Sequence, residues 1–196
     1  EYVLDPTQGS IGINGYRPDN MYDIVNIAKT KAIDSLLDHQ YLDVFQKTYV
    51  DVVRNARDGN LLFQGALENG PEIKTTFSDN DFSKSLNMIA RTISVHEQLG
   101  FKRQVFYVNF YGWDHHDEVL QNQVDMFNIV NDGLVEFYAA MEELNLTKQV
   151  ATFSISEFGR SLTSNGNGTD HAWGGNSFII GGDINGSRIF GDYPAL

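Results

Sequence analysis

Two apolar runs that flank one long amphipathic segment constrain the fold of this chain most strongly. Residues 104–112, "QVFYVNFYG", and residues 149–156, "QVATFSIS", are short and nearly continuous apolar runs, typical of strands covered on both faces of a parallel sheet. Residues 117–144, between them, repeat apolar side chains at helical spacing. A strand, a helix and a strand in this order predict a βαβ unit with a right-handed crossover, and therefore an α/β fold.

The remaining elements are predicted from the same periodicity. Residues 83–99 place apolar side chains on one helical face, and Gly100 follows them as a stop signal. The stretch from residue 21 to about residue 60 predicts two helices, whereas residues 1–20 mix Gly, Pro, Asn and Asp and indicate irregular surface chain. Glycines at 59 and 65 and the tract "ENGPE" indicate a connection before the third helix. A last apolar run, "SFIIGG", follows the polar loop near the C-terminal end.

Length and composition set the expected domain organisation. The chain has 196 residues, of which 41% are hydrophobic, so it is long enough for one sizeable core. We expect a single α/β domain, with residues 1–82 as an irregular and helical N-terminal part and residues 83–196 as the motif-bearing βαβ part. Because the sequence starts at Glu1 rather than at Met and stops without a terminating pattern, we expect it to be a fragment of a longer protein.

Charge and residue usage exclude several classes of function. The net charge is −12, from 26 acidic and 14 basic residues, which argues against a nucleic-acid partner because phosphate binding relies on a concentrated Lys and Arg surface. The chain has no cysteine, so disulfides and thiolate metal sites are excluded. No apolar run approaches the roughly 20 residues that a membrane-spanning helix needs, so no membrane span is expected.

Three polar clusters follow the predicted strands. "GWDHH" ends the first run, "SEFGR" ends the second, and "GTDHAWGG" lies on the glycine-rich loop that follows. In a parallel α/β sheet, ligands collect beyond the carboxyl ends of the strands, so these clusters are expected to meet at one edge. Carboxylates and imidazoles together are the ligand set for zinc, manganese or iron. The residues expected to converge are Asp114, His115, His116, Glu157, Asp170 and His171.

Each cluster alone also has a simpler interpretation. Asp114 stands just before a predicted helix and fits an N-terminal cap, which taken singly is the favoured interpretation. Glu157 fits an ion pair with Arg160 equally well. The tryptophans at 113 and 173 are favoured as packing residues, and the histidines at 39 and 96 fall within helical patterns and receive no role. It is the shared edge of three clusters that favours a metal or anion site, at roughly two to one.

The four motifs "GWDHH", "SEFGRSL", "NGNGTDHAWGG" and "IFGDYPAL" resemble, in order and near the spacing, those of a bacterial family known as domain of unknown function 1501. The resemblance runs from about residue 83 to residue 196. It implies an exported bacterial protein, periplasmic or secreted and often sent through the twin-arginine route. It also implies a layered α/β/α fold with a mainly parallel sheet, related to the alkaline phosphatase and sulfatase superfamily.

The resemblance also implies roles for single residues. Asp114 and His116 match the first metal-binding pair of that superfamily, and His171, with Asp170 beside it, matches a later histidine. Glu157 stands where the aspartate of the second pair would be. Two positions depart from the pattern, since a phenylalanine at 158 occupies the place of the second pair's histidine and His115 replaces the family's threonine.

These roles predict a divalent-metal site (zinc, manganese or calcium) formed by Asp114, His116, Glu157, Asp170 and His171. We expect the metal to serve a hydrolase of phosphate or sulfate esters, whose partner is a small anionic ester or a sulfated or phosphorylated glycan.

Two side chains next to these ligands are expected to contact the substrate. Arg160 would hold the anion and His115 would face solvent or substrate. No catalytic nucleophile is recognisable, because the serines at 156 and 161 lie on the segment assigned to ligation and nothing before residue 83 presents a hydroxyl at a helix start. The alternative is a non-catalytic exported or envelope protein in which the same cluster holds a structural ion or binds a glycan.

Overall fold

The computed structural model describes residues 4–7, 9–10, 12, 16, 18 and 22–192. Contacts within the chain divide it into two compact units. The first unit comprises residues 1–71 and 91–104, and the second comprises residues 72–90 and 105–196. Among the described residues, no helix is both long enough and apolar enough to cross a membrane.

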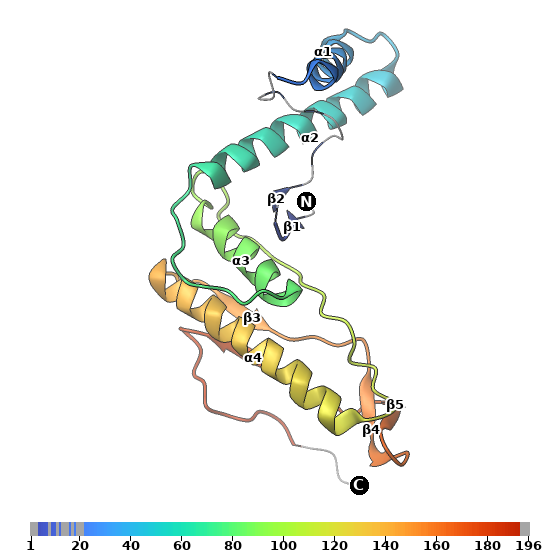
Figure 1. Ribbon diagram of the computed structural model, residues 1–196, viewed down its shortest axis with the longest axis vertical. Helices are drawn as coiled ribbons and strands as arrows, with labels where there is room; N and C mark the ends of the chain where they lie inside the picture. Colours follow the sequence, from blue (N-terminus) through green and yellow to red (C-terminus); the bar gives the residue numbers. More distant parts are fainter. Residues whose placement is uncertain are drawn as a thin grey trace. The chain divides into compact units, whose positions relative to one another are not determined.

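The first unit is built mainly from two helices, α1 (Ile24–Asp38) and α2 (Val44–Glu68) (Figure 1). Each begins at an aspartate whose side chain accepts hydrogen bonds from two backbone N–H groups of the first turn, Asp23 for α1 and Asp43 for α2. A short antiparallel pair, β1 (Leu4–Asp5) and β2 (Gly9–Ser10), lies in the stretch that the sequence indicates as irregular. The prediction of two helices is confirmed.

The second helix extends further than the sequence indicates. We expected a connection from about residue 60, but α2 continues to Glu68 and ends at the cap residue Asn69, inside the tract "ENGPE". The extra turns bury Phe63, which is 1% exposed, together with Ala66 and Leu67. Burial of an aromatic and an aliphatic side chain stabilises the helix by more than the roughly 1 kcal/mol that a glycine in the helix costs, so the glycines fail to end it.

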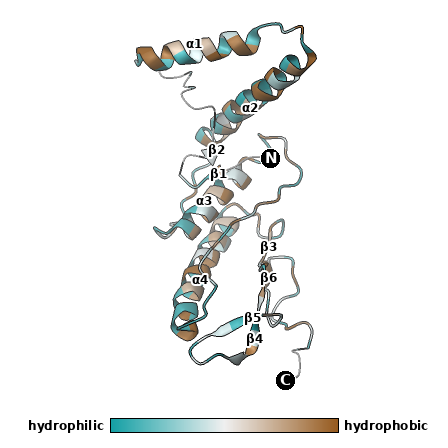
Figure 2. Ribbon diagram, turned by 90° about the vertical axis from the view of Figure 1, so that its right-hand side faces the viewer, coloured by the Kyte–Doolittle hydropathy of each residue, from teal (hydrophilic) through white to brown (hydrophobic). Residues whose placement is uncertain are grey.

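The second unit contains the long helix α4 (Val119–Glu143), and α3 (Asp81–Ser94) runs from this unit into the first. Both helices were predicted from periodicity and are confirmed, and Gly100, with φ +70°, ends the turns that follow α3. Gly133 of α4 faces Phe82 at the start of α3, where an added Cβ would lie 2.8 Å from the ring. Hydrophobic residues recur along α4 in Figure 2, which agrees with its burial of Phe137, Ala140 and Met141.

The strands differ from the prediction of a parallel sheet. β3 (Ala151–Phe153) pairs with β6 (Ile179–Gly181), and β4 (Gly159–Ser164) pairs with β5 (Thr169–Ala172), both antiparallel. Each sheet has two strands among the described residues. The structure is therefore mixed α/β, with small antiparallel sheets.

Residues 104–112, predicted as a buried strand, form extended chain without a strand partner among the described residues. Their side chains alternate between half-buried and exposed, and Val105 and Tyr111 are 95% and 80% exposed. The period of two expected for a strand is present, whereas burial on both faces is not. The apolar run did not by itself distinguish a strand within a sheet from an extended chain with one covered face.

Candidate metal centre

The candidate site lies where the β4–β5 hairpin meets the chain that leads into α4. Asn165 and Asn167, in the hairpin turn, hold this contact. The Nδ2 of Asn165 donates to the backbone oxygen of His116 over 3.3 Å, and the N–H of Val119 donates to the backbone oxygen of Asn167 over 3.3 Å. The side-chain amide of Asn167 also donates to the carboxylate of Asp117. Two segments about 50 residues apart in the sequence are thereby fixed side by side.

Gly168 permits this close approach. A Cβ at this position would lie 2.7 Å from the backbone nitrogen of Asp117, and nearer still to the carbonyl group of His116. Since ordinary contacts begin at 3.4 Å, no larger residue fits without a shift of the backbone. The glycine therefore sets how near the hairpin comes to the start of α4.

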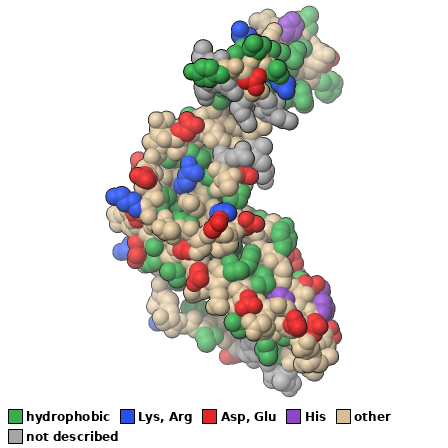
Figure 3. All heavy atoms as spheres, viewed as in Figure 1, with side chains coloured by type: hydrophobic (Ala, Val, Ile, Leu, Met, Phe, Trp, Pro, Cys, Tyr) green, Lys and Arg blue, Asp and Glu red, His purple; other side chains and the backbone are tan. Residues whose placement is uncertain are grey.

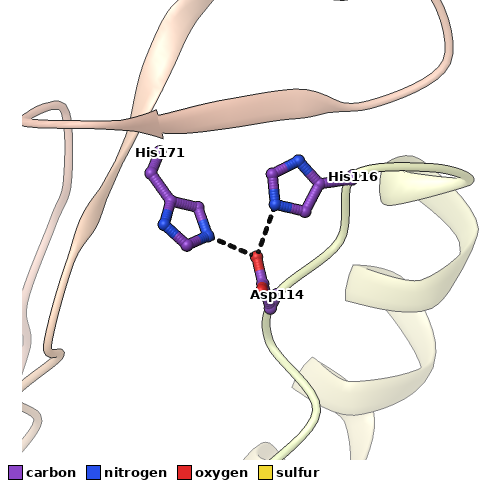
Figure 4. A group of neighbouring side chains, drawn as sticks. All are labelled: Asp114, His116 and His171. Carbon is purple, nitrogen blue, oxygen red and sulfur yellow. Dashed lines mark hydrogen bonds and ion pairs between the residues drawn. The ribbon is translucent and has the colours of Figure 1, made fainter.

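Three side chains converge at this contact (Figure 4). Asp114 and His116 come from the chain before α4, and His171 comes from β5. The Oδ1 of Asp114 lies 3.0 Å from Nε2 of His116 and 2.7 Å from Nε2 of His171. One ligand atom from each of the three residues lies within 4.8 Å of the others, so this group can hold a metal ion. The two imidazole rings are stacked, with centroids 5.0 Å apart.

The group lies at the surface. The side chains of Asp114, His116 and His171 are 54%, 50% and 50% exposed. Figure 3 shows histidine and acidic side chains side by side on this part of the surface. A hydrogen bond from His171 lowers the pKa of the Asp114 carboxyl below its ordinary value, against the opposing effect of burial, and the charges of His171 and His116 and a hydrogen bond from Arg160 lower it further. The carboxylate is therefore ionised and ready to act as a ligand.

Arg160 binds both segments that carry the three side chains. Its Nη2 donates to the carboxylate of Asp114 over 2.8 Å and to the backbone oxygen of Trp113 over 3.0 Å, and its Nη1 donates to the backbone oxygen of Thr169 over 2.7 Å. The side chain is only 16% exposed. Because one guanidinium binds both segments of the site, these contacts favour a structural role over the substrate-binding role expected for Arg160.

Phe158 packs against two residues of the site. Its ring stacks on the imidazole of His171, with centroids 4.1 Å apart and 14° between the planes, and the guanidinium of Arg160 lies 5.1 Å above it. The aromatic ring of Phe158 therefore holds one ligand and its supporting arginine in place, although it offers no ligand atom itself.

The other predicted site residues lie outside the group of three. Glu157 is exposed and makes no ion pair with Arg160 or with any other described residue, in contrast to the simpler interpretation. Asp170 contacts His116 from the far side of its ring, with Oδ1 3.3 Å from Nδ1. His115, expected to face solvent or substrate, has a buried Nε2 without a hydrogen-bond partner among the described residues.

The ligand atoms fit a divalent transition metal. Metal–nitrogen and metal–oxygen distances of about 2.0–2.2 Å place the ligand atoms of a tetrahedral site about 3.3 Å apart. The observed 3.0 Å and 2.7 Å separations need to open by only about half an ångström, which exposed side chains achieve by small rotations. Two imidazoles and one carboxylate are also a common ligand set of catalytic zinc and of non-haem iron.

The fold and the site thus define a mixed α/β protein with an exposed two-histidine, one-carboxylate cluster. A family described as "Protein of unknown function (DUF1501)" matches residues 68–196, about two thirds of the chain. The chain belongs to this family, as its motifs predicted. Comparison with curated proteins and with solved structures finds no significant match.

Sequence reasoning missed the residues that assemble the site. Asn165, Asn167 and Gly168 were interpreted only as part of a loop, although they carry the contacts between the hairpin and α4. Their sequence signal, alternating Asn and Gly, is that of a tight turn. A turn pattern gives the local conformation but not the segment against which the turn packs.

Proposed function

We propose that Asp114, His116 and His171 bind one divalent transition-metal ion, and that the centre belongs to an exported hydrolase of phosphate or sulfate esters. The convergence of three ligand atoms from two segments distant in the sequence is the observation that carries this proposal. The three side chains are about half exposed, so the remaining coordination positions are open to water and to a substrate anion.

Ligand chemistry favours zinc, manganese or iron at this site. Calcium takes 6–8 oxygen ligands in proteins. The cluster instead offers two imidazole nitrogens and one carboxylate, so calcium is disfavoured among the ions expected from the sequence. A bound ion would polarise an ester oxygen and lower the pKa of a bound water.

Neither of the two serines that flank the site is placed to act as a nucleophile. The hydroxyl of Ser156 donates to the backbone oxygen of Phe158 over 2.9 Å, and that of Ser161 donates to the backbone oxygen of Thr163 over 2.8 Å. Neither hydroxyl contacts the cluster. Hydrolysis would therefore depend on water at the centre, or on a hydroxyl other than those of Ser156 and Ser161.

The same observation favours a second candidate function. Because neither serine hydroxyl contacts the cluster, the centre also suits a non-catalytic envelope protein that holds a structural ion or binds a glycan. The assay that separates the two is turnover of aryl phosphate and aryl sulfate esters by the purified chain with added zinc or manganese. Turnover lost in His171→Ala supports the hydrolase. Metal binding without turnover supports the second function, since removal of a nucleophile typically costs several orders of magnitude in rate.

The finer fold and the location form part of the proposal. We propose that residues 104–112 and β3 are strands of one mainly parallel, alkaline-phosphatase-like sheet in a layered α/β/α fold, supported by the alternating exposure of residues 104–112 and by α4 between the two segments. Protection of the amides of residues 104–112 from hydrogen exchange would support it, and exchange at the rate of unfolded chain would contradict it. Export to the periplasm or the exterior is supported by the family resemblance.

A further inference from the structure

The ring of His116 has a different partner on each of its nitrogens. Nε2 faces the Oδ1 of Asp114 over 3.0 Å, inside the group of three ligand atoms. Nδ1, on the other side of the ring, faces the Oδ1 of Asp170 over 3.3 Å. Asp170 is not one of the three residues whose ligand atoms lie within 4.8 Å of one another.

Asp170 is itself held in place by the hairpin turn. Its Oδ1 accepts a hydrogen bond from Nδ2 of Asn165 over 3.1 Å, and its backbone N–H donates to the hydroxyl of Ser161 over 3.2 Å. The same Nδ2 of Asn165 donates to the backbone oxygen of His116. The imidazole of His116, the carboxylate of Asp170 and the amide of Asn165 therefore form a closed set of contacts.

We propose that Asp170 is a positioning residue for the metal centre, not a ligand. It accepts a hydrogen bond from Nδ1–H of His116 and thereby keeps the lone pair of Nε2 directed at the ion. This inference rests on the proposed metal site and deepens it. It also differs from the sequence-based expectation, which placed Asp170 among the ligands.

The chemistry of metal-bound histidine supports this role. A histidine that ligates a metal through one nitrogen almost always donates its other N–H to a carboxylate, a carbonyl or a water, which fixes the tautomer and the ring orientation. Among the other two ligands, Arg160 holds the carboxylate of Asp114, and the ring of Phe158 packs on that of His171. The ring of His116 is half exposed and stacks on the ring of His171, and Asp170 is the partner of its Nδ1.

The test compares Asp170→Ala and Asp170→Asn with Asp183→Ala as the matched control. Asp183 is an exposed carboxylate of the same unit without a hydrogen bond or ion pair to a described residue. Zinc affinity and stoichiometry are measured by calorimetry, and the number of protein ligands by X-ray absorption. Removal of a carboxylate that hydrogen-bonds a metal ligand typically weakens metal affinity about 10–100-fold. We therefore expect Asp170→Ala to bind zinc about 10–100-fold more weakly, while it still binds one ion through the same protein ligands. Asparagine can still accept the Nδ1–H, so Asp170→Asn should lose less.

Three outcomes would overturn the proposal. Zinc affinity of Asp170→Ala equal to that of the control would remove any role for Asp170. A fall in the number of protein ligands would make it a ligand. An equal loss of zinc affinity in Asp170→Ala and Asp170→Asn would show that the effect does not depend on a hydrogen bond to His116.

The tautomer of His116 distinguishes failure of the proposed metal site from failure of the positioning role of Asp170. If the wild-type chain binds no zinc, nitrogen NMR of the metal-free protein still reports this tautomer. A proton that fully occupies Nδ1 in the wild type and is partly lost from Nδ1 in Asp170→Ala supports the positioning role even then. The same tautomer in both proteins would overturn it.

Discussion

Substitution of Gly168 by alanine should disturb the metal centre without touching a ligand. The added Cβ would lie 2.7 Å from the backbone nitrogen of Asp117, whereas ordinary contacts begin at 3.4 Å, so the hairpin turn must retreat by at least roughly 0.7 Å. Two of the bonds that hold the turn to the start of α4, from Asn165 to His116 and from Val119 to Asn167, are already 3.3 Å long. The same retreat would lengthen them to about 4 Å, beyond hydrogen-bonding distance.

The expected magnitude follows from these two bonds. Each contributes about 1 kcal/mol, so Gly168→Ala should lower the free energy of unfolding by about 2 kcal/mol, within the usual range for overpacking. Because the turn also carries Asp170 and His171 toward His116, zinc affinity should fall about 10-fold or more.

The assay combines urea denaturation, followed by tryptophan fluorescence, with zinc calorimetry. Gly175→Ala is the matched control, because an added Cβ there meets its nearest atom at 4.0 Å and the backbone lies outside the left-handed region. If Gly168→Ala and Gly175→Ala were equal in stability and in zinc affinity, the reasoning about the close approach would be refuted.

Two further predictions concern carboxylate contacts. Hydrogen bonds from the backbone N–H groups of Lys74 and Thr75 lower the pKa of the Glu143 carboxyl below its ordinary 4.5. The contribution of this carboxylate to the free energy of unfolding is therefore present above pH 4.5, and it is lost as the pH falls through the lower pKa of the folded state. Urea denaturation at pH 7 should therefore give a lower free energy of unfolding for Glu143→Gln than for the control Glu142→Gln. A difference between the two variants that does not become smaller at acidic pH would contradict this prediction. Arg160→Met should lower the free energy of unfolding by about 1–3 kcal/mol and weaken zinc binding, because Asp114 and two backbone oxygens lose their hydrogen-bond donor. A free energy of unfolding and a zinc affinity equal to those of the wild type would contradict a structural role for Arg160.

The fold was predictable where local patterns decide it. The helices α3 and α4 follow from apolar periodicity, because each buries one face. The extent of α2 was not predictable, because the burial of Phe63 overrides the glycine signals. The pairing of β3 with β6 was likewise not predictable, because strand partners distant in sequence are chosen by tertiary contacts that periodicity does not encode.

The candidate site was predictable in its ligands but not in its supports. Clustered Asp and His residues at predicted segment ends indicated Asp114, His116 and His171, and the structure brings them together. The same reasoning treated Asp170 and Glu157 as equivalent to them. Whether a carboxylate lies beside the ligand nitrogen of an imidazole or beside its other nitrogen depends on how the hairpin turn packs. Residue type and spacing carry no information on that packing.

Binding of one metal ion by Asp114, His116 and His171 underlies the proposed function. The most direct test is calorimetric titration of the purified, metal-free chain with zinc, with metal analysis after equilibrium dialysis. We predict one ion per chain, loss of binding in His171→Ala, and unchanged binding in the control His39→Ala, since His39 is exposed and lies in the other unit. A wild-type chain that binds no zinc, or binding that survives His171→Ala unchanged, would contradict the claim.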